Sequence, residues 1–140
     1  MKVISLWQPW ATLVAIGARE YETRSLSTRY RGLLAIHAAK RLDIVQKEYC
    51  LQDPFFAALT AANYTVGTLP LGGIVAVVKL IEIVSTNRVT VSKKERAFGN
   101  YLSGRYAWKL EMVKCLDKPI PMNGAQGFFE VADDLIMRFM

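Results

Sequence analysis

The sequence predicts an α+β fold in which a small sheet is covered by short helices. Five or six stretches have the apolar, β-branched composition of strands, and two or three segments between them have the apolar spacing of helices. With 140 residues, 52% of them hydrophobic and 21% charged, the chain is long enough for one core and short for two. No internal repeat or low-complexity segment divides it. Residues 1–140 are therefore expected to form a single domain built on a compact barrel.

The charge balance favours negatively charged partners. Lys and Arg number 18 against 12 acidic residues, a net charge of +6, which suits nucleic acid without requiring it. The two cysteines, Cys50 and Cys115, stand in no Cys-x-x-Cys arrangement, so neither a disulfide framework nor a metal site is expected, and no cofactor motif is present. No segment approaches the roughly 20 apolar residues of a membrane helix. Gln8 and Pro9 interrupt the apolar start, so a cytoplasmic protein without membrane contact is expected.

The first elements lead to the densest group of charged residues. Residues 3–6 are β-prone, and the strand ends before Pro9 because proline donates no hydrogen bond to a sheet. A helix is expected over residues 9–16, and Gly17 can end it because glycine readily adopts a positive φ. Trp10 should belong to the core on its helical spacing. Trp7, at the end of the strand, could instead stack on a nucleobase.

Residues 17–24 read Gly-Ala-Arg-Glu-Tyr-Glu-Thr-Arg. If they are extended, Glu22 and Arg24 are neighbours on one face and Arg19 lies on the other, because side chains alternate along a strand. A carboxylate beside a planar guanidinium can present donors in a fixed geometry to an anionic or planar polar ligand. The same residues can also form an ion pair at a solvated strand end, and charge spacing alone favours this second interpretation.

A polar connection over residues 25–32 places Tyr30 between Arg29 and Arg31. Arginines interleaved with an aromatic residue suit contacts to phosphates and bases. Arginines in a loop are, however, ordinarily only solvated.

An apolar strand is expected over residues 33–38, close to Lys40. It contains His37, the only histidine of the chain. A hydrogen-bonded core histidine is commoner in such a strand than a catalytic one, but His37 stays a candidate because it is close in sequence to residues 17–24.

The longest apolar strand is expected at residues 74–84, with Lys79 on one face and Glu82 on the other. A carboxylate on an apolar face is a candidate for acid–base chemistry, because burial disfavours its charged form. Residues 85–103 are polar and basic and form either a mobile loop facing nucleic acid or a solvated linker. The remaining expected elements are helices beginning at Asp43 and at Asp53-Pro54, an alternating strand over residues 105–116, and a last strand over residues 128–131 before a short terminal helix.

Gly17, Arg19, Glu22 and Arg24 resemble the signature Gly-x-Lys-x-x-Glu-x-Arg of the ASCH domain family, with Arg19 where the family usually has Lys. The resemblance extends to Ser5-Leu6-Trp7-Gln8-Pro9-Trp10, to Tyr30-Arg31-Gly32 and the following strand, and to Gly104-Arg105-Tyr106-Ala107-Trp108 with Pro119-Ile120-Pro121. It therefore spans almost the whole chain. It implies a PUA-like small β-barrel of five or six strands with two or three covering helices, and a cleft in which the signature residues gather beside the long central strand.

The resemblance implies two classes of function. As an RNA-binding module related to PUA domains, the chain would contact phosphates through its arginines and Lys40 and stack bases on Trp7 or Tyr30. As a hydrolase it would resemble small bacterial members that remove acyl groups from N-acylated cytidine, or another member reported as a ribonuclease. The positions of this chain that correspond to the catalytic residues of the amidohydrolase members are Arg19, Glu22 and, by strand placement, Glu82.

Two of these three positions differ from the amidohydrolase members, which have Lys at Arg19 and Thr at Glu22. Arginine stays protonated at any working pH, so Arg19 cannot accept a proton, and Glu22 has no hydroxyl to offer. Binding of RNA, a nucleotide or a nucleoside is therefore the preferred prediction, with hydrolysis as the alternative and a protein-interaction domain as a second one. The predicted ligand-binding residues are Arg24, Trp7, Tyr30, Arg31, His37 and Lys40.

Overall fold

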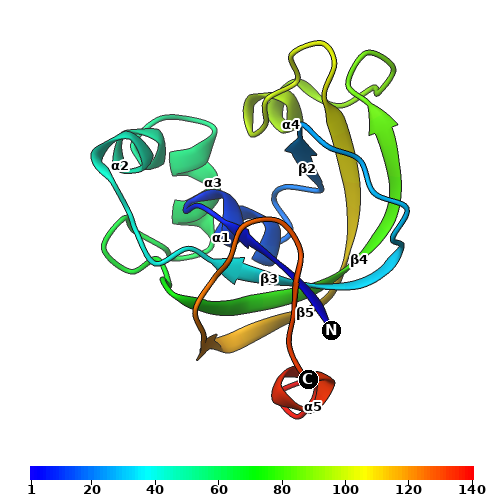
Figure 1. Ribbon diagram of the computed structural model, residues 1–140. Coiled ribbons are helices and arrows are strands. Elements are labelled where there is room, and N and C mark those ends of the chain that lie inside the picture. Colours follow the sequence, from blue (N-terminus) through cyan, green and yellow to red (C-terminus); the bar gives the residue numbers. More distant parts are fainter.

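A six-stranded sheet with the strand order β2-β5-β4-β3-β1-β6 runs through the structure (Figure 1). This computed structural model describes all residues, 1–140. The strands are β1 (Lys2–Leu6), β2 (Tyr21–Arg24), β3 (Gly32–Ala38), β4 (Gly73–Ser85), β5 (Tyr106–Pro121) and β6 (Phe129–Glu130). β1 is parallel to β3, and the other neighbouring strands are antiparallel. The α+β class and the number of strands agree with the sequence-based prediction.

The sheet is strongly curved but open, with β2 at one edge and β6 at the other (Figure 1). Its two long strands, β4 and β5, pair with three register shifts, at Ile74/Ala76, Val77/Val78 and Leu80/Glu82. Such bulges bend a strand and increase its twist. The closed barrel that the resemblance implies is not confirmed, because no pairing joins β2 to β6.

Five short helices accompany the sheet, against two or three expected covering helices and a short terminal one. They are α1 (Trp10–Ala15), α2 (Ile44–Cys50), α3 (Phe55–Ala61), α4 (Lys93–Ala97) and α5 (Asp133–Met137). Only α4 was missed, because residues 85–103 were interpreted as a loop or linker. Its start carries a recognisable signal, since Ser92 and Glu95 have capping-box spacing and the Ser92 Oγ accepts from the Glu95 N–H at 3.0 Å. None of the helices is long and apolar enough to cross a membrane.

α1 lies in the hollow of the curved sheet and connects two parts of the core (Figure 1). Ala11 and Val14 pack against buried residues of β1, β3, β4 and β5. On another side of the helix, Leu13 packs with a cluster that includes Cys50, Phe55, Leu59 and Phe98. Gly17 follows with a φ of +78°, as expected for a glycine that ends a helix. This packing fixes the point from which residues 19–24 start.

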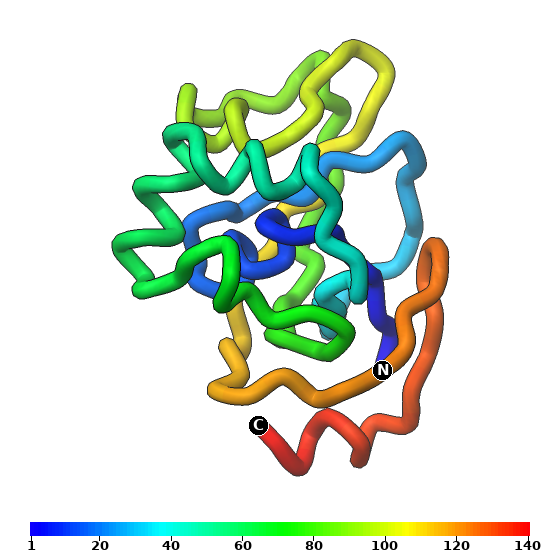
Figure 2. The backbone as a smooth tube through the Cα atoms, turned by 90° about the vertical axis from the view of Figure 1, so that its left-hand side faces the viewer, coloured from blue at the N-terminus to red at the C-terminus, as the bar shows by residue number.

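The start of the chain lies beside its last segment, which contains β6 (Figures 1 and 2). β6 pairs with β1, and the amino group of Met1 donates to the carbonyl oxygen of Val131 at 2.6 Å. Ile136 of α5 packs against Val3 and Val77 in a cluster separate from that around α1. The segment between β5 and β6 is thereby held close to β1, which positions one wall of the site described below.

Candidate functional site

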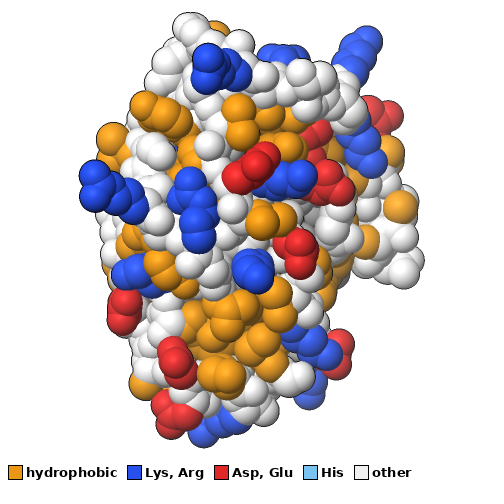
Figure 3. All heavy atoms as spheres, turned by 90° about the vertical axis from the view of Figure 1, so that its right-hand side faces the viewer, with side chains coloured by type: hydrophobic (Ala, Val, Ile, Leu, Met, Phe, Trp, Pro, Cys, Tyr) orange, Lys and Arg blue, Asp and Glu red, His pale blue; other side chains and the backbone are white.

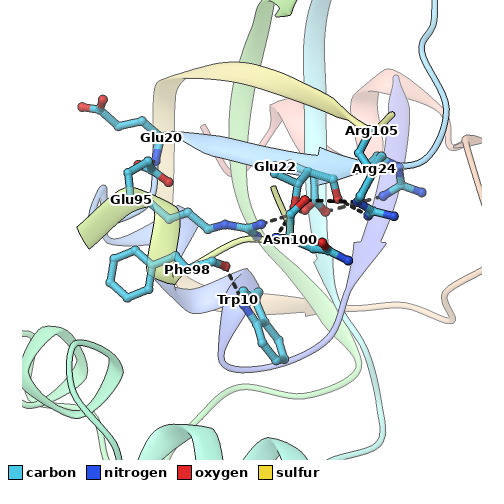
Figure 4. Close-up of polar contacts among 10 residues, drawn as sticks. Trp10, Glu20, Glu22, Arg24, Glu95, Phe98, Asn100 and Arg105 are labelled. Atoms are coloured by element: carbon cyan, nitrogen blue, oxygen red, sulfur yellow. Dashed lines mark hydrogen bonds and ion pairs between the residues drawn. The ribbon is translucent and has the colours of Figure 1, made fainter. Parts of the chain in front are cut away.

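Arg19, Glu22 and Arg24 come together at the junction between α1 and β2. Nη2 of Arg19 donates to Oε1 of Glu22 at 3.0 Å, and Nη1 of Arg24 lies 3.5 Å from Oε2 (Figure 4). Arg19 precedes β2, and its backbone N–H donates to the carbonyl oxygen of Leu13 at 3.0 Å. The expectation that Arg19 lies opposite Glu22 is therefore wrong, because strand alternation begins only after Arg19.

This group is buried rather than solvated. Arg19 is 4% exposed and Glu22 is 6% exposed, whereas the side chain of Arg24 is 26% exposed. A solvated ion pair at a strand end, the interpretation that charge spacing favoured, is excluded for Arg19 and Glu22. Two guanidinium groups hold one carboxylate, so the group keeps a net positive charge, and Arg24 is its most accessible member.

A hollow of about 450 Å³, called here the first hollow, has these three residues in its lining. Its aromatic walls are Trp7, Trp10, Tyr49, Phe55 and Phe98. Trp7 is 44% exposed, as expected for a side chain available for stacking. Trp10 also borders the first hollow, and its indole N–H donates to the carbonyl oxygen of Phe98 at 2.8 Å (Figure 4).

Asn100 and Arg105 complete the first hollow from the loop after α4. The backbone N–H of Asn100 donates to Oγ1 of Thr23 at 2.9 Å, and Nη2 of Arg105 donates to the carbonyl oxygen of Thr23 at 3.3 Å. The pairing of Arg24 with Tyr106 brings this loop to β2. Sequence reasoning did not propose either residue as a ligand contact, because nothing in local spacing connects them with Glu22.

A second hollow, of about 610 Å³, adjoins the first and shares Ser5, Trp7 and Arg24 with it. The rest of its lining includes His37, Lys40, Arg41 and residues 124–127. The two hollows together are called the cleft. The structure thus brings Arg24, Trp7, His37 and Lys40, four of the predicted ligand-binding residues, to one place.

His37 has both ring nitrogens engaged within the protein. Nδ1 lies 2.7 Å from Oγ of Ser5, and Nε2 lies 2.6 Å from the carbonyl oxygen of Met122. A carbonyl oxygen only accepts, so Nε2 carries a proton, and in the neutral ring Nδ1 accepts from the Ser5 hydroxyl. The ring is 1% exposed. His37 therefore fastens the segment after β5 to β1 and β3.

Three other predicted residues lie outside the cleft. Tyr30 donates its hydroxyl to the carbonyl oxygen of Leu33 at 2.5 Å, and Nη1 of Arg31 donates to the carbonyl oxygen of Thr28 at 2.8 Å. Glu82 is exposed on β4, opposite Lys109. The expectation of a buried Glu82 is wrong, because β4 leaves the core after the register shift at Leu80.

Glu95 of α4, and not Glu82, is the buried carboxylate near this group. It is 8% exposed, and its Oε1 accepts from the backbone N–H of Glu20 at 2.7 Å (Figure 4). Burial raises the pKa of Glu95, and the Glu20 N–H and the charge of Arg19 offset part of this effect. Burial and the nearby Glu95 also raise the pKa of Tyr101 to about 12. Glu95 is not part of the cleft lining and fixes α4 to the start of β2.

The electrostatics of the cleft are basic. Five cationic side chains and one carboxylate line it, namely Arg19, Arg24, Lys40, Arg41, Arg105 and Glu22. The face in Figure 3 differs, since its Lys and Arg side chains are mixed with Asp and Glu around an apolar area. No group of three or more His, Cys, Asp or Glu side chains could hold a metal ion. The cleft therefore suits an anionic ligand with a planar, stackable part.

The curved sheet and the cleft lined by residues of the motif define a small α+β domain with one candidate binding site. The sequence matches the ASCH domain over residues 4–120, so the chain belongs to the ASCH domain family. The crystal structure of ASCH from Zymomonas mobilis has a TM-score of 0.56 at 15% identity, covering 98% of this chain and 91% of that one. Two point mutants of that protein give TM-scores of 0.55 at 16% identity, covering 98% of this chain and 94% and 92% of theirs. At such identities the likeness concerns the fold. No curated protein matches the sequence.

Proposed function

We propose that this ASCH domain binds single-stranded RNA, or a nucleotide or nucleoside, in the cleft. The observation that carries the proposal is the buried Glu22, held between Arg19 and Arg24 in the same hollow as the exposed Trp7. The family is PUA-like and generally linked to RNA binding, which agrees with this chemistry. The net positive charge of the chain, +6, favours the same class of partner.

Each part of a nucleotide finds a complementary group in the cleft. A base has a π-face that can stack on an aromatic side chain such as Trp7, and its N–H groups can donate to the carboxylate of Glu22. The guanidinium of Arg24 can donate to phosphate or to base acceptors through a fixed fork. The volume of the first hollow, about 450 Å³, lies within the range of small-molecule sites.

Hydrolysis has less support from the same geometry. Arg19 and Glu22 are in contact, but Glu82, the third residue carried over from the amidohydrolase members, is exposed and outside the cleft. Arg19 keeps its proton at any working pH. The carried-over residues are therefore not assembled for acid–base chemistry, and binding is the better-supported function.

The binding test uses fluorescence anisotropy of a labelled single-stranded RNA. Wild-type protein should bind more weakly at about 200 mM salt than at about 50 mM salt, because phosphate contacts release counterions. Arg24→Ala should weaken binding by about tenfold or more, the value of a charge-assisted contact. Arg138→Ala is the matched control, since Arg138 is exposed and outside the cleft. Circular dichroism checks that both variants fold.

The proposal is overturned if wild-type protein binds no RNA, nucleotide or nucleoside, or if Arg24→Ala binds as well as Arg138→Ala. A parallel incubation with N-acylated cytidines and labelled RNA examines turnover. Free cytidine or cut RNA, produced by wild-type protein and lost in Arg24→Ala, would establish a hydrolase in the cleft instead. Intact substrates that nevertheless bind would support a binding domain.

A further inference from the structure

The geometry points to two subsites within the cleft. The second hollow binds the phosphate of a nucleotide, and the first hollow binds its base. This inference rests on the proposed function and deepens it, because it names a phosphorylated ligand rather than a nucleoside. The phosphate can belong to a free nucleotide or to an RNA backbone. Four observations support it. They are the difference in charge between the two hollows, the free donors of the second hollow, the fixed position of residues 124–127, and the residues that both hollows share.

The charges of the two hollows differ. The first hollow contains the only carboxylate of the cleft, Glu22, together with most of the aromatic lining. The second hollow is lined by Arg24, Lys40 and Arg41 and by no Asp or Glu. A phosphate in the first hollow would lie beside the carboxylate of Glu22 as well as the arginines there, whereas the lining of the second hollow offers cations without a carboxylate. A base suits the first hollow because the hollow offers aromatic side chains for stacking and both donors and an acceptor for the polar edge of the base.

The second hollow also has donors that no protein group occupies. Arg41 is paired with Asp43, with 3.2 Å between Nη2 and Oδ2, but Lys40 forms no ion pair. The backbone N–H groups of residues 124–127 form no backbone hydrogen bond, although these residues line the hollow. Successive free N–H groups and a compact ammonium are typical partners of phosphate.

The wall that carries these N–H groups is held in place. His37 bonds to the carbonyl oxygen of Met122 at 2.6 Å, just before this segment. A Cβ added at Gly124 would lie 2.8 Å from Cε1 of His37 and 2.8 Å from Oγ of Ser5, so the backbone itself rests on these side chains. The amide groups of residues 124–127 therefore keep a defined position beside the hollow.

The two hollows are close enough for one ligand to occupy both. Ser5, Trp7 and Arg24 line each of them. A base stacked on Trp7 in the first hollow would place its attached phosphate near Arg24 and Lys40. Arg24 would then lie beside the ribose that joins the base to the phosphate.

The test compares nucleosides with their 5′- and 3′-monophosphates and with a short single-stranded RNA by calorimetric titration. In wild-type protein the phosphate should strengthen binding by about tenfold. Lys40→Gln should lose most of this gain while its nucleoside affinity changes less than about twofold. Lys114→Gln, an equal change of charge at an exposed residue of β5 outside the cleft, should keep the full gain.

The outcomes separate this inference from the proposed function. Equal affinity for nucleosides and monophosphates in wild-type protein, or an unchanged gain in Lys40→Gln, overturns the phosphate subsite and leaves nucleoside binding intact. Absence of binding to every probe overturns both. Tighter binding of free monophosphates than of nucleosides would identify a nucleotide as a sufficient ligand. Tighter binding of RNA alone would assign the subsite to a phosphodiester.

Discussion

Arg19 and Glu22 form a buried ion pair, with 3.0 Å between Nη2 and Oε1, and the second oxygen of the same carboxylate lies 3.5 Å from Nη1 of Arg24. Glu22 is thus the link through which a buried guanidinium and a partly exposed one are held together. This arrangement fixes Arg24 at the boundary between the two hollows, where it faces any ligand of the cleft. The motif therefore stabilises β2 and, under the proposed function, also forms part of the binding surface.

Glu22→Gln should destabilise the protein by about 3 kcal/mol or more, because it leaves the charge of Arg19 buried beside a neutral partner. Arg19→Met should cost a similar amount. The double variant Arg19→Met/Glu22→Leu should cost less than the two single changes together, since the only unpaired charge left, that of Arg24, is partly exposed. Urea unfolding measures the free energy of unfolding of all three variants. If each single variant loses less than about 1 kcal/mol, the buried pair does not stabilise β2 as described.

Gly124→Ala should destabilise the protein by about 1–3 kcal/mol, because the new methyl group would overlap His37 and Ser5. The contact distance of 2.8 Å to Cε1 of His37 leaves no room without movement of the wall. The same variant should weaken binding of monophosphates. Gly67→Ala is the control, since its nearest neighbour atom would be 3.9 Å away. Equal unfolding midpoints for the two variants would contradict the close contact.

Glu95 should make stability depend on pH. Burial raises the pKa of this carboxyl, so the folded state holds its proton more tightly than the unfolded state. Its stabilising contribution is therefore complete below the unfolded pKa and is lost as the pH rises through the higher folded pKa.

Glu95→Gln removes this dependence and should gain stability relative to wild type as the pH increases. Thermal unfolding between about pH 4 and pH 8 measures the difference. Glu48→Gln, at an exposed position of α2, serves as the control. Parallel curves for wild type and Glu95→Gln would show that Glu95 does not titrate differently on folding.

Patterns among neighbouring residues predicted most of the helices and strands, because local interactions largely determine where these elements form. Helical spacing and Gly17 predicted α1, and apolar or alternating runs predicted the strands, although β2 was only a conditional expectation, β5 extends beyond the predicted residues 105–116, and α4 was missed. The exposure of Glu82 could not be predicted, because periodicity defines the face of a strand but not where the strand leaves the core.

Long-range pairing decided the rest of the site. Asn100 and Arg105 reach the cleft because β5 pairs with β2, and the orientation of Arg19 follows from the way α1 ends. The role of residues 124–127 depends on their contact with His37, far away in the sequence. None of these relationships has a signal in neighbouring residues.

Trp7→Ala should weaken binding of single-stranded RNA by about tenfold, because base stacking on an aromatic side chain contributes about 1–3 kcal/mol. Trp7→Phe keeps a smaller aromatic face and should retain part of the affinity. The exposed fraction of Trp7, 44%, makes a large loss of stability unexpected. Fluorescence anisotropy measures the binding, and full affinity in Trp7→Ala would exclude stacking at this position.

The most direct test of the account follows the indole N–H signals of the three tryptophans by NMR while a nucleotide or RNA is added. Trp7 is exposed in the cleft, whereas Trp108 is 3% exposed and donates to the carbonyl oxygen of Leu26 at 3.1 Å. A ligand in the cleft should shift the Trp7 signal saturably and more than the Trp108 signal. Bound RNA that leaves the Trp7 signal unmoved would place the binding surface elsewhere and contradict the central claim.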